Sequence, residues 1–395
     1  MALVNLSKHI PKGLIKNNSI IAKKGKGCWV WDKSGQKYLD MTSGIGTLST
    51  GHSHPNVINR VKNQLDNIVH AQQNCFYSHS EQEILLDKMS KILPNKHDTI
   101  FFTNSGSEAT DNAIKIARMS TNKSNIITMN GGFHGRTLAS MSISSSKTSY
   151  RKGFQPLIPG VFFCNESTEE AIDNILENQT APEETCAIIM EPILGEYGII
   201  KLPDKFVSYV RKVCTEKDIK LIFDEVQCGS GRTGKWWASD YLNITPDLMT
   251  FAKGIGSGFP IGGVSGNSEI FNKMTKNSLG GTYNGNAIST AACNATIDTI
   301  IEENLMSNAN TIGEEIRINL LKLPYIKEVR QYGLFIAADI NDDIDVNDII
   351  ERAIDNNLIL ISCGKNSLRI LPPLIINKKE VEIFIDSLYK TLKTF

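Results

Sequence analysis

The chain has 395 residues, and its 42 basic and 42 acidic side chains balance to a formal charge of zero. This balance argues against binding to nucleic acid or to an anionic membrane, because both need a basic surface. The length exceeds what one ordinary core supports, so we expect a large domain with a smaller one beside it and room for a buried small-molecule site.

The eight cysteines are scattered along the chain and form no C-x-x-C pair. This pattern predicts reduced thiols and a cytoplasmic location. We find no run of about eighteen apolar residues, and residues 1–18 lack the apolar core of a secretory signal, so we expect no membrane association. Residues 1–26 carry lysines and no acid, as mitochondrial presequences do, but they contain no arginine.

The amino-terminal part predicts a hairpin followed by a loop and a helix. Residues 27–32 and 36–40 are typical of short strands, and Lys33, Ser34 and Gly35 form a turn between them. Residues 42–55 hold too many glycines for the interior of an element and predict an ordered loop. Pro55 suits the start of a helix over residues 56–68.

Between residues 98 and 254, short apolar runs alternate with stretches of helical periodicity. Such alternation predicts a mainly parallel sheet with helices on both faces. The predicted strands cover 99–102, 125–129, 186–190 and 221–226, and a further apolar run covers 248–252. One predicted helix begins at residue 107, and another covers residues 203–216.

The pattern changes after a long helical stretch from residue 287 to about 321. We predict strands at 329–340, 358–362 and 368–370, and helices at 346–356 and 378–392. With the amino-terminal hairpin, this tail is interpreted as a smaller α+β domain. The expected division is therefore 1–45 and 291–395 for the small domain and 46–290 for the large one.

An acid and an amine stand where apolar runs end. Asp224 ends the run 221–224, and Lys253 follows the run 248–252. Open α/β sheets place their ligand crevice at the carboxyl ends of strands, so the two groups are expected to converge. Pyridoxal phosphate needs such a pair, a buried amine of lowered pKa and an anion beside its ring nitrogen. The alternatives are a capping acid and a solvated lysine.

Two glycine-containing turns precede predicted helices. Gly106 and Ser107 follow a strand and open a helix, so their backbone amides form a natural seat for a phosphate. An ordinary helix cap is the alternative. The loop 280–286 precedes the long helical stretch, and its hydroxyl, that of Thr282, and its amides suit either a phosphate or a cap.

The segment Gly132-Phe133-His134-Gly135-Arg136-Thr137 follows the next strand and predicts an irregular loop. The flat side chain of Phe133 suits stacking on a planar ring, and the guanidinium of Arg136 suits a carboxylate. A surface loop with a solvated arginine is the competing interpretation.

Glu191 and Glu196 follow another predicted strand, and Arg369 is a lone charge in the apolar run 368–374. A buried Arg369 needs an acidic partner, and Glu196 is the expected one. The alternative is an arginine that reaches solvent from an edge strand.

Other chemistries find little support in the sequence. His52 and His54 lack the spacing of metal ligands and are interpreted as structural residues of a loop, so no metal is predicted. The Ser-His-Asp order, the phosphate-binding loop of NTPases and a G-x-G-x-x-G after a strand are missing, which counts against hydrolases, NTPases and dehydrogenases.

Taken together, these segments resemble the class III aminotransferases that use pyridoxal phosphate. The similarity is greatest to 4-aminobutyrate aminotransferases, then to the acetylornithine and ornithine enzymes, and it extends from about residue 9 to the end. The segments are NSGSEATDNAIKIAR (104–118), GFHGRT (132–137), EPILGEYG (191–198), FDEVQCGSGRTGKWWA (223–238), FAKG (251–254), GGTYNGN (280–286) and LRILPPL (368–374).

The resemblance implies an α/β enzyme of fold type I, with a mainly parallel seven-stranded sheet flanked by helices and a smaller α+β domain. It also implies a homodimer with active sites at the subunit interface. Lys253 is then the Schiff-base lysine and proton carrier, and Asp224 pairs with the ring nitrogen. The resemblance also implies that Val226 and Phe133 lie on opposite faces of the ring and that Gln227 lies near the ring hydroxyl. At the phosphate it implies Gly106 and Ser107 of the same subunit and Thr282 of the partner subunit.

For the reaction, the resemblance implies a ping-pong transamination through pyridoxamine phosphate, from an ω-amino acid such as 4-aminobutyrate to 2-oxoglutarate. Glu196 and Arg369 pair while the donor is bound and part when the 2-oxo acid arrives. Arg136 holds the distal carboxylate in both half-reactions.

Some positions depart from the family pattern. Ile45 stands where ornithine enzymes carry tyrosine, which favours 4-aminobutyrate-like donors. Leu194 replaces a frequent glutamine, and Ala287 a frequent proline. Acetylornithine and ornithine therefore stay open as donors. So do racemisation, and a pyridoxal phosphate-binding protein without turnover.

Overall fold

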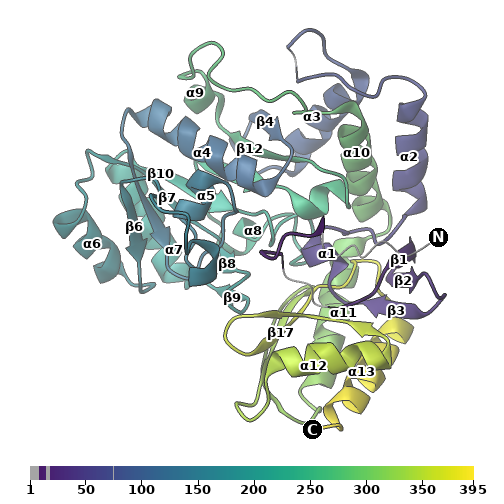
Figure 1. Cartoon of the computed structure of the whole chain (residues 1–395). Coiled ribbons are helices and arrows are strands. Elements are labelled where there is room, and N and C mark those ends of the chain that lie inside the picture. The colour runs from purple at the N-terminus through teal and green to yellow at the C-terminus, as the bar shows by residue number, and fades with distance from the viewer. Residues whose placement is uncertain (1–8, 15–17, 74) are drawn as a thin grey trace.

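The structure is a computed structural model that describes residues 9–14, 18–73 and 75–395. The amino-terminal segment that we compared with leader sequences falls partly outside these residues. Figure 1 shows two parts: a sheet covered by helices, and a smaller group of strands and helices that holds the carboxyl-terminal end.

A seven-stranded sheet in the order β4-β12-β11-β10-β7-β5-β6 is the centre of the larger part. β12 pairs antiparallel with both of its neighbours, and the other pairs are parallel, which confirms the predicted mainly parallel sheet. The strands are β4 (Thr99–Thr103), β5 (Asn125–Met129), β6 (Val161–Cys164), β7 (Thr185–Met190), β10 (Lys220–Asp224), β11 (Leu248–Phe251) and β12 (Gly262–Gly266).

Helices bury both faces of this sheet. Neighbouring residues of β5 point to opposite faces: Ile126 joins the core under α4 (Gly106–Thr121), and Ile127 joins the core under α6 (Glu169–Asn178) and α7 (Asp204–Glu216). This alternation follows from the two-residue period of a strand. Because both faces are apolar, polar groups are expected mainly where the strands end.

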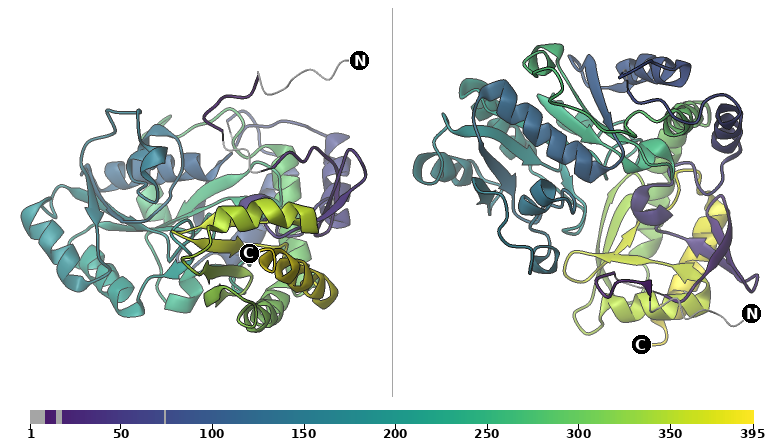
Figure 2. Two further views of the ribbon diagram at one scale, coloured as in Figure 1. Left: turned by 60° about the horizontal axis from the view of Figure 1, so that its bottom comes forward. Right: turned by 45° about the horizontal axis from the view of Figure 1, so that its top comes forward.

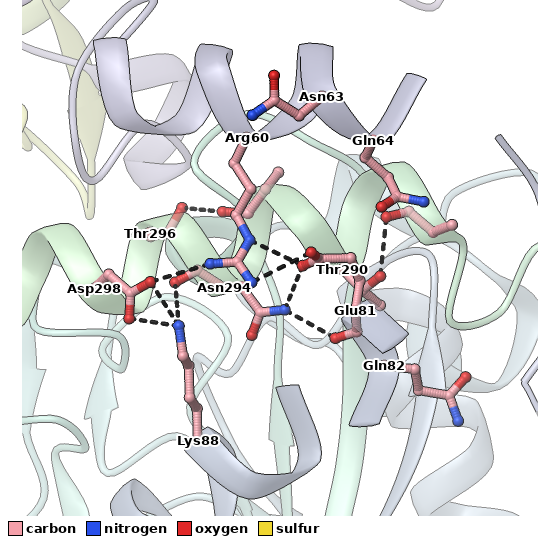
Figure 3. A network of polar contacts seen from close by, with 12 residues as sticks. Arg60, Asn63, Gln64, Glu81, Gln82, Lys88, Thr290, Asn294, Thr296 and Asp298 are labelled. Atoms are coloured by element: carbon pink, nitrogen blue, oxygen red, sulfur yellow. Dashed lines mark hydrogen bonds and ion pairs between the residues drawn. The ribbon is translucent and has the colours of Figure 1, made fainter. Parts of the chain in front are cut away.

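The helices α2 (Pro55–Leu65), α3 (Ser80–Ile92) and α10 (Ala287–Glu302) pack together beside the sheet and share a polar network, shown in Figure 3. Arg60 Nε lies 2.9 Å from Glu81 Oε2, and Arg60 Nη1 lies 3.3 Å from Asp298 Oδ2. Lys88 Nζ contacts Asp298 Oδ1 at 2.5 Å, and Asn294 Nδ2 donates to Glu81 Oε2 at 2.8 Å.

The smaller part combines amino-terminal and carboxyl-terminal segments of the chain, and in the right view of Figure 2 the purple strands lie beside the yellow carboxyl-terminal elements. Leu39 in β3 (Lys37–Asp40) pairs in parallel with Leu358 in β15 (Leu358–Ile359), in a sheet of order β1-β2-β3-β15. A second sheet has the order β13-β14-β17-β16. The other elements are β1 (Ala22–Lys26), β2 (Trp29–Asp32), β13 (Ile326–Tyr332), β14 (Phe335–Ile340), β16 (Ile361–Cys363), β17 (Ser367–Ile370), α11 (Leu305–Leu320), α12 (Val346–Ala353) and α13 (Lys378–Leu392).

Several predicted boundaries are wrong. The strand predicted over 329–340 is the hairpin β13–β14, because Gly333 turns the chain with φ +56°. The helical stretch predicted over 287–321 is broken at Asn304, which has a left-handed φ of 52°, so it forms α10 and α11. The strand predicted to reach Val226 ends at Asp224.

Other elements were not predicted at all, including β1, β6, β12, α3 and α6. The short remaining elements are α1 (Ser43–Gly46), α5 (Leu138–Ser142), α8 (Ser239–Leu242), α9 (Ser268–Phe271), β8 (Ile193–Leu194) and β9 (Ile200–Lys201). Of the helices that the structure describes, none is both long enough and apolar enough to cross a bilayer.

Candidate active site

A cavity of about 360 Å³ lies where β10 and β11 end and α4 begins. It is deep enough in the fold to take a substituted aromatic ring. Seven of the residues predicted from the sequence line it: Gly106, Ser107, Phe133, Asp224, Val226, Gln227 and Lys253.

Asp224 ends β10 and is almost fully buried, at 3% exposure. Its Oδ1 accepts a hydrogen bond from the backbone N–H of Val226 at 3.0 Å, and its Oδ2 lies 2.7 Å from Nδ1 of His134. Burial disfavours a charged imidazole, but the hydrogen bond and charge of Asp224, with that of Glu191, outweigh this effect and raise the pKa of His134.

Lys253 begins a short 3-10 helix (Lys253–Gly256) one residue after the end of β11, and it borders the same cavity as Asp224. Its backbone adopts a left-handed φ of 47°, which is uncommon for a residue other than glycine. Burial lowers the pKa of its ammonium, and the nearby carboxylates of Asp224 and Glu196 oppose that shift. The uncharged amine is the form that attacks a carbonyl carbon, and a lowered pKa makes this form more abundant near neutral pH.

The start of α4 forms one end of the cavity. Ser105 is the N-cap, with its Oγ accepting the N–H of Glu108 at 3.2 Å, so the capping interpretation also holds. Ser107 Oγ accepts the backbone N–H of Arg136 at 3.0 Å and keeps its own hydrogen available. A Cβ on Gly106 would lie 2.7 Å from Val226 Cγ1, so only glycine leaves this approach open.

Glu191 holds two loops against the cavity. Its Oε1 accepts the N–H of Phe133 at 2.9 Å, and its Oε2 accepts the N–H of Gly195 at 3.0 Å. It thereby fixes Phe133 at the cavity wall and the segment that leads to Glu196. Burial raises the pKa of Glu191, and the neighbouring charge of Asp224 adds to this, while His134 opposes it.

Glu196 and Arg369 form a buried ion pair, with 2.5 Å between Oε1 of Glu196 and Nη1 of Arg369. The same Nη1 donates to Oε1 of Gln227 at 3.2 Å, and Gln227 lines the cavity. Nε of Arg369 is buried without a hydrogen-bond partner. An arginine in this state attracts a further anion, since part of its hydrogen-bonding capacity is unused.

Arg136 lies on the exposed side of the cavity wall. Its guanidinium lies 3.9 Å from the ring centre of Tyr150 and 5.7 Å from that of Phe133. It has no ion-pair partner among the described residues. The group is therefore held in place and free to receive a carboxylate.

Two further predicted residues, besides Arg136, Glu196 and Arg369, do not line the cavity of this chain. Ile45 is 39% exposed and does not line it, although Thr47, two residues on, does. Thr282 is exposed in the loop before α10 and lines no part of it. Its predicted place is in the site of a partner subunit.

The two histidines that the sequence analysis set aside each face one carboxylate. His52 Nε2 lies 2.8 Å from Asp40 Oδ2, and His54 Nε2 lies 3.2 Å from Glu303 Oε1.

Two residues of the site were missed in the sequence analysis. His134 is part of the segment 132–137, and a histidine between two glycines just past a strand was a signal that could have been weighed with Phe133. Tyr150 carries no local signal, because only the folded loop brings it to Arg136 and Phe133.

The residues present fit pyridoxal phosphate. A helix start with a glycine suits the phosphate, and two apolar side chains border the cavity. A buried carboxylate and an amine of lowered pKa line the same cavity. Lys253 would hold the cofactor covalently, Asp224 would face the ring nitrogen, and Gly106 and Ser107 the phosphate. The cofactor supplies an electron sink for the carbon that loses its proton.

Comparison with known proteins agrees with this geometry. The sequence profile of the family described as Aminotransferase class-III matches residues 14–392. The chain is 37% identical to the 4-aminobutyrate aminotransferase GabT of Escherichia coli (strain K12), over 95% of this chain and 94% of the relative. It is 35% identical to an acetylornithine aminotransferase of Archaeoglobus fulgidus, over 95% and 96% of the two chains.

Among solved structures, the ornithine aminotransferase of Toxoplasma gondii ME49 superposes with a TM-score of 0.90 at 26% identity, over 98% of this chain and 93% of that one. The fold, the site and the sequence all lead to one family. The chain belongs to the class III aminotransferases, which are enzymes that use pyridoxal phosphate.

Proposed function

We propose that this enzyme transfers the amino group of an ω-amino acid, 4-aminobutyrate in the first place, to 2-oxoglutarate. The buried Glu196–Arg369 pair beside the Lys253 cavity is the observation that carries the proposal. 4-Aminobutyrate has no carboxylate on the carbon that bears the amino group, whereas 2-oxoglutarate has one beside its oxo group. A site that serves both must offer and withdraw a positive charge at that place.

The Glu196–Arg369 pair meets this requirement. With the donor bound, Glu196 neutralises Arg369, so no buried charge is left without a partner. With 2-oxoglutarate bound, its carboxylate replaces Glu196 at the guanidinium, and the contact with Gln227 keeps Arg369 at the cavity. Arg136 holds the distal carboxylate that both substrates share.

Lys253 is proposed as the proton carrier of the reaction. Because burial lowers its pKa, Nζ accepts and returns a proton near neutral pH more readily than an ordinary lysine. Asp224, held by its 2.7 Å contact with Nδ1 of His134, places the charge of a carboxylate in the same cavity. That charge favours a protonated, electron-withdrawing ring.

A donor panel scored by glutamate formation tests the proposal. We expect 4-aminobutyrate to give the highest kcat/KM with 2-oxoglutarate. A higher value for acetylornithine or ornithine would move the proposal to that donor, and exchange of alanine enantiomers without glutamate would indicate racemisation. The purified holoenzyme should be yellow and lose the colour when donor is added alone. A Lys253→Ala variant that still turns over would contradict the role of Lys253.

We also propose that the enzyme is a homodimer with shared active sites. Large apolar side chains lie exposed in two neighbouring segments, with Phe76 at 83%, Tyr283 at 65% and Tyr77 at 57% exposure. The backbone N–H of Gln73 donates to the carbonyl of Asn284 at 2.9 Å and so joins these segments. Such exposed apolar groups are typical of an interface, and we propose that Thr282, which lies in the same loop as Tyr283, reaches the site of the partner subunit.

The division of the chain and its cellular location are proposals as well. Pairing of β3 with β15 supports a small domain built from 1–45 and 291–395, leaving 46–290 as the large one. The eight free cysteines support a reducing, cytoplasmic compartment.

A further inference from the structure

The guanidinium of Arg136 is held by an aromatic ring instead of an acid. Tyr150 lies under it at 3.9 Å, and among the described residues no carboxylate is paired with it. A guanidinium that stacks by its face keeps the N–H groups of its edge directed outward, and these are the groups that grip a carboxylate in two parallel hydrogen bonds. The ring contact therefore orders Arg136, and although the Tyr150 hydroxyl also lies within hydrogen-bonding reach of the guanidinium, the other N–H groups stay available for a carboxylate.

Tyr150 is itself fixed by the cavity wall. Its ring meets that of Phe133 edge to face, with centroids 5.3 Å apart and planes at 71°. Phe133 lines the cavity and is held by the carboxylate of Glu191 through its backbone N–H. A continuous series of contacts thus runs from the wall of the cavity through Tyr150 to Arg136.

The backbone of Arg136 is fixed as well. Its backbone N–H donates to Ser107 Oγ at the start of α4. Gly135, just before it, has φ +136° and would place a Cβ 2.2 Å from the same oxygen. Main chain and guanidinium are therefore both held, and the side chain has little freedom left to lose when a substrate binds.

We propose that Tyr150 is a positioning residue for specificity, which holds Arg136 by ring stacking so that the enzyme selects substrates with a distal carboxylate. This inference rests on the proposed use of 4-aminobutyrate and 2-oxoglutarate. Tyr150 acts through Arg136 and takes no part in proton transfer. We expect the ring contact to carry most of the effect and the hydroxyl, which also contacts the guanidinium, to add little.

Two substitutions separate ring from hydroxyl. Tyr150→Leu removes the stack, and we expect KM for 2-oxoglutarate to rise about three- to thirty-fold, the range of a cation–π contact, with kcat within about twofold of the wild type. Tyr150→Phe keeps the stack and should leave both within about twofold. Phe163→Leu is the matched control, because it removes the stack of Arg151 on Phe163, at 5.0 Å and outside the cavity, and should change neither.

A double-mutant cycle with Arg136→Ala tests whether Tyr150 acts through Arg136. In that background, Tyr150→Leu should add no further change in KM. Additive effects would overturn the inference, as would an unchanged KM in the single variant or an equal loss in Tyr150→Phe. Unchanged melting temperatures exclude misfolding as the cause.

Calorimetric measurement of glutarate binding compares the wild-type and variant holoenzymes without turnover. We expect the affinity for glutarate to fall only in Tyr150→Leu, by the same factor as the rise in KM for 2-oxoglutarate. Wild-type enzyme that forms no glutamate from any donor would refute the proposed function. Loss of the stack with unchanged glutarate affinity, or wild-type enzyme that does not bind glutarate, would refute the assignment of Tyr150.

Discussion

Asp224 is held in the site by His134, whose side chain is fully buried. His134 contacts Oδ2 of Asp224 through Nδ1, and the backbone N–H of Val226 occupies Oδ1. Deleting the imidazole would leave a buried carboxylate with one hydrogen bond fewer. Because a hydrogen bond to a charged group contributes about 1.5–3 kcal/mol, its loss changes how firmly Asp224 is oriented and charged.

We expect His134→Ala to lower kcat by about tenfold to a hundredfold. His134→Asn places an amide N–H near the former Nδ1 and should recover much of the loss. Steady-state glutamate formation measures both. Equal loss in the two variants would show that the packing of the ring, and not its hydrogen bond to Asp224, is what the site needs.

The same pair predicts a pH effect on stability. The pKa of His134 is raised above its ordinary value of 6.5 in the folded protein. The stabilisation from this pair is therefore full below pH 6.5 and is lost as pH rises through the folded-state pKa. We expect the difference in unfolding free energy between wild type and His134→Ala to shrink over that range in urea titrations. A difference that grows with pH would contradict the assignment of charge.

Glu196 and Arg369 predict a difference between the two half-reactions. Glu196→Ala leaves Arg369 with only Gln227 as a partner, so a positive charge faces the donor, which has no carboxylate to offer there. We expect kcat/KM for the donor to fall about tenfold or more while that for 2-oxoglutarate changes less. Arg136→Ala should raise KM for both substrates. Small and equal effects of the two variants would contradict this division of roles.

At the scale of elements, the strands and helices that the sequence predicted best are those with strong apolar patterns. β5, β7 and β10 are buried on both faces and appear in the sequence as short apolar runs. β12 was missed because its sequence, GGVSG, has the composition of a loop, and it becomes a strand only through pairing with β4 and β11.

The active site shows the same division. Asp224 and Lys253 were predictable because each follows an apolar run, and strand ends meet at one edge of a sheet. Tyr150 lies in a loop whose position depends on contacts distant in sequence, so no local pattern indicates it. The ends of α10 and α11 depend on one left-handed residue, Asn304, whose conformation the helical periodicity does not reveal.

The polar network of α2, α3 and α10 gives a prediction about an element interface. Asp298 on α10 accepts from Lys88 on α3 and pairs with Arg60 on α2. Asp298→Asn should lower the unfolding free energy by about 1 kcal/mol, since these groups are partly exposed and screened. Glu302→Gln, an exposed change on the same helix, is the control. Urea unfolding of the two variants measures the change in unfolding free energy. Equal midpoints for Asp298→Asn and Glu302→Gln would show that the network adds nothing to stability.

At the scale of the whole molecule, the proposed shared active site predicts that activity depends on residues from two subunits. In the proposed homodimer, Lys253 of one subunit and Thr282 of the partner subunit would serve the same site, and the exposed Phe76 and Tyr283 would be covered. Phe76→Glu places a charge in that surface and should shift the protein towards monomers in sedimentation equilibrium. Ile383→Glu, on the exposed side of α13, is the matched control and should not.

Subunit mixing then tests whether the sites are shared. Lys253→Ala should abolish activity, and Thr282→Glu should strongly reduce it, because the new carboxylate repels the phosphate. When the two variants are unfolded together and refolded, a heterodimer contains one site with both native residues. Activity should therefore return to about a quarter of the wild-type value, since half of random dimers are mixed and each mixed dimer has one intact site. No recovery, in a mixture shown to contain heterodimers, would place Thr282 outside the partner's site.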